Sequence, residues 1–595
     1  MWIVGFFLSC ACLVLSVLGC FAIHNNYIKK LKIGLFNALF AGVFLSTLLV
    51  FLPLHNANSV PTFLGGCRTF FLSLFNAMQV FTIGCDYAFQ AENMMQCPQW
   101  LMTIYQTWVS TLFVLAPIMT FGFVLSLFKN ISAYCRYLFS YFRDVYVFSA
   151  LNEKSLTLAS DIKSNHANAV IVFTDVYDDR DEHVSELLEE AKKIDAICFN
   201  KDLLAINFQK HSPGKDIFFF TLGNDETENL NQALKLIEAY KTRTLTHIYV
   251  FSTKTESELL LTSADKGVVK VRRVNEVQSL INRVLYADGD VIFRSAKEDT
   301  DGVKDISAII VGMGRHGTEM VKALSWFCQM DGYRVTIHAF DKDPLAEEKF
   351  SALAPELMSE AYNGVRAEGE AQYSITIHSG IDTASLTFTK AIAQITNATY
   401  VMVALGDDDV NINTAVNLRM QFERMKIHPV IHSIVYNSQQ KKALEGIKNY
   451  RGQTYDIDFI GDLESSCAES VILDSELEAE ALQRHLKWGK EEEFWTYEYN
   501  YRSSIASAIH FHARIRCGIP GAGKREEELT PAERLVIETL EHRRWNAYMR
   551  AEGYIYSGSK EKSSRNDLGK MHHDLVDYAS LSEEEKRKDS RVGTK

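Results

Sequence analysis

The stretch from Ile309 to Asp343 constrains the fold of this chain more than any other. It opens with an apolar run typical of a short buried strand, and Gly312, Gly314 and Gly317 follow as G-x-G-x-x-G. Helical spacing comes next, and then a second apolar strand that ends at Asp341. In such a turn the first glycine allows a tight bend, the second lets backbone N–H groups approach a pyrophosphate, and the third lets helix and strand pack closely. The sequence therefore predicts a phosphate-binding turn that faces the positive end of a helix.

Asp341 completes this pattern at the end of the second strand. A carboxylate in that position is placed to accept a hydrogen bond from a ribose hydroxyl. We therefore expect this unit to bind NAD(H) or another adenine nucleotide. The alternative is a unit that keeps the fold but has lost its nucleotide.

The chain divides sharply by hydropathy. It has 595 residues and a net charge of −12, which argues against a nucleic-acid partner. Residues 1–143 are very apolar, so we expect them to form a transmembrane domain in contact with lipid. The expected spans are Trp2–Ile23, Ile33–Leu54 and Leu101–Phe128. No basic n-region or A-x-A cleavage site is present at the N-terminus, so we expect no signal peptide.

Basic residues set the expected topology. They follow the first span at Lys29, Lys30 and Lys32, and the last span at Lys129, Arg136 and Arg143. Because basic loops stay on the cytoplasmic side, both places should be cytoplasmic. Three spans with the N-terminus outside satisfy this if Arg68–Gly84, which is short for a span, only dips in from the outer face. Four full spans do not satisfy it. We expect a multi-pass membrane protein whose C-terminal domains are cytoplasmic.

The dipping segment is itself informative. A short helix is expected at Phe70–Phe81, and Thr82-Ile83-Gly84-Cys85-Asp86 follows it. This segment resembles the T-V-G-Y-G-D filter of potassium channels, which follows a pore helix between two spans. The second glycine is missing and Cys85 replaces the aromatic residue, so strict potassium selectivity does not follow. The resemblance implies Thr82, Ile83 and Gly84 as pore residues for monovalent cations; the alternative is an ordinary short fourth helix.

From Val145 onwards, strands alternate with helices, which is typical of a parallel sheet. The first turn here, Ser149–Glu153, contains no glycine, so a pyrophosphate would not approach it in the usual way. The run Gly223–Glu226 after one strand recurs as Gly406–Asp409 after another, so the second unit repeats the first.

The stretch Gly380–Asn411, taken with the glycine motif, resembles the RCK domain, the nucleotide-binding regulator of potassium channels and transporters. The resemblance covers roughly 145–460 as two tandem copies, assigned to 144–300 and 301–465. It implies a Rossmann-like fold, pairing into a homo-oligomer (dimer or tetramer), and ligand binding that pulls on attached pore helices. The nucleotide contacts that it implies are Gly312, Gly314, Gly317, Asp341 and Asp408. The alternative for 407–409 is a solvated turn that caps the next helix.

After a helical linker at 466–525, a last unit covers 526–595. Thr530, Pro531 and Glu533 predict the start of a helix there. The set E-H-x-x-W…G-Y…H-x-D-L-V-x-Y…L-S-x-E-E-K follows, and it resembles the RyR domain, a small module repeated in ryanodine receptors and fused to other domains in bacteria. Departures from that pattern are Asp574 in place of proline and Tyr554 in place of tryptophan. By this resemblance we expect a protein of the bacterial plasma membrane.

Aromatic residues of this last unit are candidates for a stacking pocket that takes a nucleotide-like small molecule. They are Trp545, Tyr554, Tyr556, His572 and Tyr578. The alternative is that they form the core of the small module. His542 and His572 have no cysteine or HExxH partner nearby, so we expect hydrogen-bonding histidines rather than a zinc site.

Taken together, the sequence predicts a multi-domain chain with an N-terminal α-helical membrane domain, two Rossmann-like α/β domains and a small, mainly helical RyR-like domain. Residues 129–144 contain no proline or glycine, so a continuous amphipathic helix should join the last span to the first strand. The leading function is a ligand-gated cation channel or transport protein, and we expect no enzyme activity. A membrane-permeabilising stress or phage-defence effector is the alternative. An NAD(P)-dependent oxidoreductase ranks low, because no S-x-x-x-Y-x-x-x-K set occurs in the soluble region.

Overall fold

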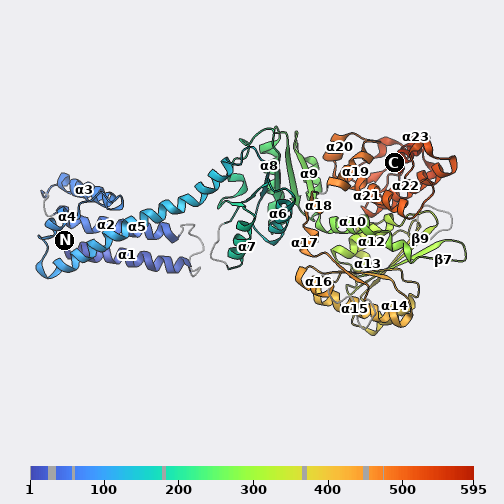
Figure 1. Cartoon of the computed structure of the whole chain (residues 1–595), viewed down its shortest axis with the longest axis horizontal. Helices are drawn as coiled ribbons and strands as arrows, with labels where there is room; N and C mark the ends of the chain where they lie inside the picture. Colours follow the sequence, from blue (N-terminus) through green and yellow to red (C-terminus); the bar gives the residue numbers. More distant parts are fainter. Residues whose placement is uncertain are drawn as a thin grey trace. The chain divides into compact units, whose positions relative to one another are not determined.

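The computed structural model describes residues 2–24, 35–56, 60–176, 182–364, 372–445, 455–473 and 475–595. They divide into two compact units, Met1–Leu138 and Phe139–Lys595 (Figure 1). The basic cluster at 29–32, which carries half of the topology prediction, lies outside the described residues.

The N-terminal unit is helical. Its helices are α1 (Trp2–His24), α2 (Leu35–Asn56), α3 (Phe63–Phe81), α4 (Tyr87–Met94) and α5 (Gln99–Leu138). Helix α2 packs against α1, α3 and α5. Among the described residues, two helices are long and apolar enough to cross a membrane, at Leu39–Asn56 and Gln99–Phe121, and Trp2–Leu18 is a shorter apolar helix.

Helices α3 and α4 each pack against α5. The carbonyl oxygen of Phe81, the last residue of α3, accepts a hydrogen bond from Thr120 Oγ1 at 3.0 Å. The hydroxyl of Tyr87, the first residue of α4, lies 2.7 Å from Ser110 Oγ. Ser110 precedes Thr120 by ten residues of one helix, about 15 Å at 1.5 Å per residue. Between the end of α3 and the start of α4, the chain therefore passes from the level of Thr120 to the level of Ser110. The helix of this segment is longer than predicted, because it begins at Phe63, where Thr62 caps it by accepting from Gly65 N.

The second unit contains two parallel sheets of the same strand order. In the first sheet the order is β3-β2-β1-β4-β5-β6. Its strands are β1 (Val145–Phe148), β2 (Val170–Phe173), β3 (Ile197–Cys198), β4 (Ile217–Thr221), β5 (Thr246–Phe251) and β6 (Lys270–Val274). Its helices are α6 (Glu153–Asn165), α7 (Glu182–Lys193), α8 (Glu226–Tyr240), α9 (Thr255–Ser263) and α10 (Glu276–Asp288), with α11 (Val291–Arg294) leading out.

The second sheet has the order β10-β9-β8-β11-β12-β13, with β7 (Lys297–Glu298) antiparallel to β8. The strands are β8 (Lys304–Val311), β9 (Tyr333–Asp341), β10 (Tyr373–Ser379), β11 (Tyr400–Val403), β12 (Val430–Ile434) and β13 (Ile457–Ile460). The helices are α12 (Arg315–Phe327), α13 (Ala346–Leu353), α14 (Leu386–Gln394), α15 (Asp408–Met425) and α16 (Ser438–Glu445). Helices α14 and α15 cover one face, and α12 and α13 cover the other (Figure 1). Both sheets thus have the 3-2-1-4-5-6 order of the Rossmann fold.

Paired side chains confirm that the second sheet repeats the first. Asn229 in α8 accepts from Gly223 N and donates to Phe251 O, at 2.7 and 3.1 Å. Asn411 in α15 accepts from Leu405 N and donates to Ile434 O, at 2.6 and 2.9 Å. In each half, one buried amide ties the loop after the fourth strand to the end of the fifth.

The C-terminal region is mostly helical. Its elements are α17 (Leu463–Ser466), α18 (Glu469–Ile472), α19 (Ser475–His485), α20 (Glu491–Thr496), α21 (Glu498–Arg516), α22 (Pro531–Ala551), β14 (Ile555–Tyr556), β15 (Met571–His572) and α23 (Glu583–Gly593). The predicted capping box holds, because Thr530 and Glu533 cap α22 reciprocally and Pro531 is its first residue.

The segment predicted as a linker, 466–525, is packed into its neighbours. Val471 and Ile472 of α18 lie in the core of the first sheet. His510 of α21 lies 2.9 Å from the carbonyl oxygen of Gln329, which follows α12. Residues far apart in the sequence therefore complete both α/β halves.

The predicted connector helix is correct for its first part only. Helix α5 continues without a break from the apolar segment to Leu138, but 139–143 form turns rather than helix. His211 Nε2 lies 2.7 Å from the carbonyl oxygen of Arg143, and the ring of Tyr141 packs against the same histidine. These tertiary contacts override the helical spacing of the sequence.

Candidate functional site

Two of the three motif glycines are required by the fold. Gly312, between β8 and α12, has a φ of +96°, and a Cβ there would lie 2.4 Å from the carbonyl oxygen of Ala404. A Cβ on Gly317 would lie 1.8 Å from the carbonyl oxygen of Gly312. Both contacts are with backbone, which does not yield as a flexible side chain would. The tight turn and the close helix–strand packing predicted for these residues are therefore present.

Gly314 is different, because nothing in the protein requires a glycine there. Its φ is −68°, which any residue adopts, and a Cβ would meet no atom within 4 Å. The residue is the N-cap of α12, and no side chain caps this end of the helix. Its N-terminal N–H groups and positive dipole end carry no side-chain cap, so they are open to a ligand.

The equivalent turn in the first half is closed by its own side chains. Asn152 caps α6 by accepting from Ser155 N at 2.9 Å, and Ser155 Oγ accepts from Asn152 N at the same distance. The Asn152 amide also donates to Leu222 O at 2.8 Å. Two backbone donors of this turn, Asn152 N and Ser155 N, are therefore already occupied by its own side chains. That the first unit does not bind a nucleotide in the same mode stays a prediction.

The glycine turn opens into a cavity of about 1000 Å³. Gly312, Gly314 and Asp341 line it from the second half, and Lys154 and Thr253 line it from the first. The carboxyl ends of the strands in an open α/β sheet are where ligands bind. The volume lies at the upper end for small-molecule sites, which suits a dinucleotide.

Charged side chains from both halves meet in this cavity. Lys154 Nζ bonds the carboxylate of Glu276 at 2.7 and 2.9 Å, and both residues line the wall. Arg315, the first residue of α12, also lines it. Burial would raise the pKa of Glu226, but hydrogen bonds from Thr253 and the charge of Arg315 lower it. A carboxylate of the first half therefore lies within electrostatic reach of the glycine turn in the second.

Asp341 holds the glycine turn in shape. It lies at the end of β9 and on the cavity wall, as predicted. One carboxylate oxygen accepts from Met313 N at 2.6 Å, and the other accepts from Asp343 N at 2.7 Å. Each oxygen keeps a second lone pair for a ribose hydroxyl.

Asp408 does not line the cavity, although its neighbour Asp407 does. Its carboxylate accepts from Tyr436 N and Asn437 N at 2.9–3.1 Å, beyond the end of β12. Asp407 caps α15 by accepting from Val410 N at 3.0 Å. The acidic run thus behaves here as the capping turn that was the alternative interpretation.

The five aromatic candidates of the C-terminal module do not form one pocket. Trp545 and His572 meet edge to face with centroids 4.8 Å apart, and both line a second cavity of about 100 Å³. Tyr554 is buried in the hydrophobic core. The backbone N–H of Tyr556 donates to Glu356 of the second half, and Tyr578 donates to Glu538 at 2.5 Å. Burial lowers the pKa of His572 to about 2, so this imidazole is neutral.

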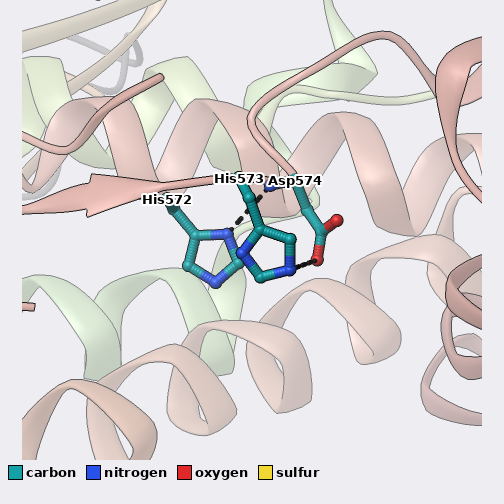
Figure 2. A group of neighbouring side chains, drawn as sticks. All are labelled: His572, His573 and Asp574. Carbon is teal, nitrogen blue, oxygen red and sulfur yellow. Dashed lines mark hydrogen bonds and ion pairs between the residues drawn. The ribbon is translucent and has the colours of Figure 1, made fainter. Parts of the chain in front are cut away.

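His572, His573 and Asp574 bring metal-ligating atoms within 4.8 Å of one another (Figure 2). His572 makes a hydrogen bond within this group, whereas His573 Nε2 lies 3.3 Å from the Asp574 carboxylate and neither ring nitrogen of His573 has a hydrogen-bond partner among the described residues. His572 Nδ1 accepts from Asp574 N at 3.1 Å, which places its proton on Nε2. The two imidazole rings stack with centroids 4.7 Å apart and 11° between their planes. The nitrogen lone pairs of each imidazole lie in the plane of its ring, so those of two stacked rings lie in parallel planes. Two histidines that bind one metal ion need lone pairs that point to the same place.

The pore candidates form the end of a helix. Ile83 N donates to Val80 O at 3.3 Å, and Gly84 N donates to Gln79 O at 2.8 Å. This pair of bonds is a Schellman motif, with Ile83 in its left-handed position at a φ of +61°. Thr82, Ile83 and Gly84 thus cap α3 in a single copy of the chain, and Thr82 Oγ1 bonds the carbonyl oxygens of Met78 and Gln79.

Helix α3 exposes large apolar side chains and buries several polar ones, which is opposite to the usual pattern of a helix in water. Thr69 and Ser73 are 5% and 0% exposed, whereas Leu64, Phe71 and Phe75 are 78%, 64% and 57% exposed. Such an outward apolar face is unfavourable in water. On the same inward side, Asn76 Nδ2 lies 2.7 Å from Nε2 of His55 in α2.

Sequence reasoning missed several residues that shape these sites. Lys154, Glu276 and Thr253 reach the large cavity from another domain, and no local pattern points to them. The capping role of Asn152 could have been predicted, because this residue precedes a helical run in a turn without glycine.

No protein-family model matches this chain, and no curated protein matches it either. The resemblances to RCK and RyR domains therefore stay predictions from the motifs.

Proposed function

We propose that this chain is a ligand-gated membrane conduit for monovalent cations, in which NAD(H) or another adenine nucleotide binds between the two Rossmann-like halves. The observation that carries the proposal is Gly314. It leaves the end of α12 uncapped beside a cavity of about 1000 Å³, while the matching turn of the first half is closed by Asn152. Phosphates bind at such helix ends.

The membrane part of the proposal rests on the N-terminal unit. Two of its helices are long and apolar enough to span a bilayer. The outward apolar face of α3, and the packing of α3 and α4 against α5, suit a re-entrant segment with lipid outside and polar groups inside. The location is then a bacterial plasma membrane with the α/β halves in the cytoplasm.

Regulation would pass along α5. This helix runs for 40 residues, and six residues separate its end from the start of β1. The chain itself therefore connects the helical unit to the first Rossmann-like half. In this proposal the halves act as RCK domains in a homo-oligomer (dimer or tetramer), the C-terminal module acts as an RyR-type ligand sensor, and no enzymatic step is needed.

One observation favours a second candidate, an effector that permeabilises the membrane without selectivity. The Thr82–Gly84 segment caps a helix instead of forming an extended filter strand. Its carbonyl groups are not arranged to replace the hydration shell of an ion.

Purified protein in liposomes separates these functions. Nucleotide-dependent cation flux without release of an encapsulated dye supports the conduit. Dye leakage supports the effector. Nucleotide turnover with neither flux nor leakage would support the low-ranked oxidoreductase and contradict the proposal.

A further inference from the structure

The smaller cavity, of about 100 Å³, lies between the helices that follow the second sheet and the C-terminal module. Helices α19 and α21 supply Arg484 and a row of polar residues, and α22 and α23 supply Arg544, Trp545 and Lys588. The space is well below that of a nucleotide site. The volume of this cavity suits a single charged group and is too small for the whole nucleotide-like molecule expected from the sequence.

A buried charge cluster stands beside this cavity. Arg544 and Arg514 are 1% and 0% exposed, and both bond the carboxylate of Glu541, which is itself 1% exposed. Arg544 Nε and Nη2 lie 3.1 and 2.8 Å from one oxygen, and Arg514 Nη2 lies 3.1 Å from the other. Two buried guanidinium groups therefore share one carboxylate, which leaves one positive charge uncompensated.

The third nitrogen of Arg544, Nη1, is shielded from solvent and has no hydrogen-bond partner among the described residues. A buried unpaired donor of a charged group is costly, and native structures contain few of them. Of the other acids on the cavity wall, Glu585 pairs with Lys588, and Asp574 and Asp589 face the imidazoles of His573 and His542, at 3.2–3.3 Å. None of these three carboxylates accepts a hydrogen bond from Arg544 Nη1.

Helix α21 presents hydrogen-bonding groups to the same space. Asn500, Ser503, Ser504 and Ser507 line it at positions i, i+3, i+4 and i+7, which is one face of a helix. Aromatic Trp488 and Trp545 line it as well. The hydroxyl of Ser507 already donates to Glu541, and that of Ser504 lies 3.4 Å from His485 Nδ1. Among the described residues, Ser503 is therefore the hydroxyl that can donate to an oxyanion beside the unsatisfied guanidinium.

We propose that this cavity binds the oxyanion group, phosphate or carboxylate, of a small ligand, and that Arg544 holds its charge. This deepens the sensing role proposed for the C-terminal module, on which it rests, by naming the chemistry that the module recognises. The remainder of the ligand would lie toward Trp488 and Trp545.

Equilibrium dialysis of the full chain in a maltoside detergent without phospholipid tests this, with radiolabelled inorganic phosphate and benzoate as separate probes. The expected result is saturable binding of at least one probe. Arg544→Gln should weaken it by about tenfold or more, the value of one charge-assisted hydrogen bond. Arg514→Gln is the matched control, because it removes a guanidinium from the same Glu541 but Arg514 does not line the cavity.

Ser503→Leu provides a second variant in case Arg544→Gln does not fold. It fills the cavity without removing a charge and should also abolish binding. Gly314→Val should bind the probe normally while losing nucleotide, so failure here is distinguishable from failure of the nucleotide site. If phosphatidic acid in nanodiscs competes with the bound probe, the natural ligand is a lipid headgroup. If it does not compete, the ligand is a free small molecule. Binding of neither probe, or binding that survives both Arg544→Gln and Ser503→Leu, would overturn the proposal.

Discussion

Substituting the three motif glycines one at a time separates what the fold needs from what a ligand needs. Gly317→Ala puts a Cβ 1.8 Å from a backbone oxygen, so the helix must move away from the strand. Overpacking of this kind costs about 1–3 kcal/mol or more. Gly312→Ala adds a left-handed backbone penalty of about 1–2 kcal/mol to a similar clash.

Gly314→Val should behave in the opposite way. A Cβ at this position meets no protein atom within 4 Å and the φ is ordinary, so a weaker N-cap preference is the expected cost, at about 1 kcal/mol or less. The same side chain occupies the space that phosphate oxygens need. Loss of two charge-assisted bonds, about 1.5–3 kcal/mol each, predicts a fall in nucleotide affinity of at least about 100-fold.

Thermal unfolding and calorimetric titration with NADH and ATP measure the two effects on the same samples. We expect Gly314→Val to unfold near the wild-type temperature without binding nucleotide. We expect Gly312→Ala and Gly317→Ala to unfold at clearly lower temperatures. Wild-type affinity in Gly314→Val, or a loss of stability as large as in the other two variants, would refute the reasoning.

Three further results are expected. Ile83→Gly should raise the free energy of unfolding by up to about 1 kcal/mol, because glycine takes the left-handed helix cap without a Cβ clash; an unchanged melting temperature in detergent would argue against the cap. Burial would raise the pKa of Glu541, but Arg544 and Arg514 outweigh it and hold the value at about 2. The carboxylate therefore contributes stability above its unfolded pKa, near 4.5, and loses it as the pH falls toward 2, by about 3 kcal/mol in total; denaturant unfolding of Glu541→Gln should lack this part of the acid dependence. A Gly-Ser run inserted after Ser132 should leave nucleotide binding intact but abolish its effect on cation flux, because a flexible segment absorbs displacement that a helix transmits; unchanged nucleotide-dependent flux would show that α5 is only an anchor.

Local patterns were sufficient for the α/β halves. Apolar runs of four to six residues coincide with strands such as β1 and β5. The glycine spacing predicted a turn whose steric demands at Gly312 and Gly317 follow from backbone geometry alone. The repeat could be predicted from the runs Gly223–Glu226 and Gly406–Asp409, and Asn229 and Asn411 beyond these runs make matching pairs of bonds.

Features that depend on contacts between distant parts of the chain could not be predicted from the sequence. The segment after β13 resembled a linker because its helices are short and polar, yet Val471 and Ile472 complete the core of the first sheet. Aromatic residues of the C-terminal module were grouped by type, but Tyr554 and Tyr578 have separate packing and hydrogen-bond partners. Burial of Arg544 against Glu541 has no signal in the sequence, because arginine is usually exposed in proteins.

Cation flux into liposomes, compared between wild type and Gly314→Val with and without saturating NADH, tests the central claim most directly. The account predicts that NADH changes the flux of the wild type and leaves that of Gly314→Val unchanged, with both proteins equally folded. Wild-type flux that does not respond to NADH or ATP, or a response that persists in Gly314→Val, would contradict it.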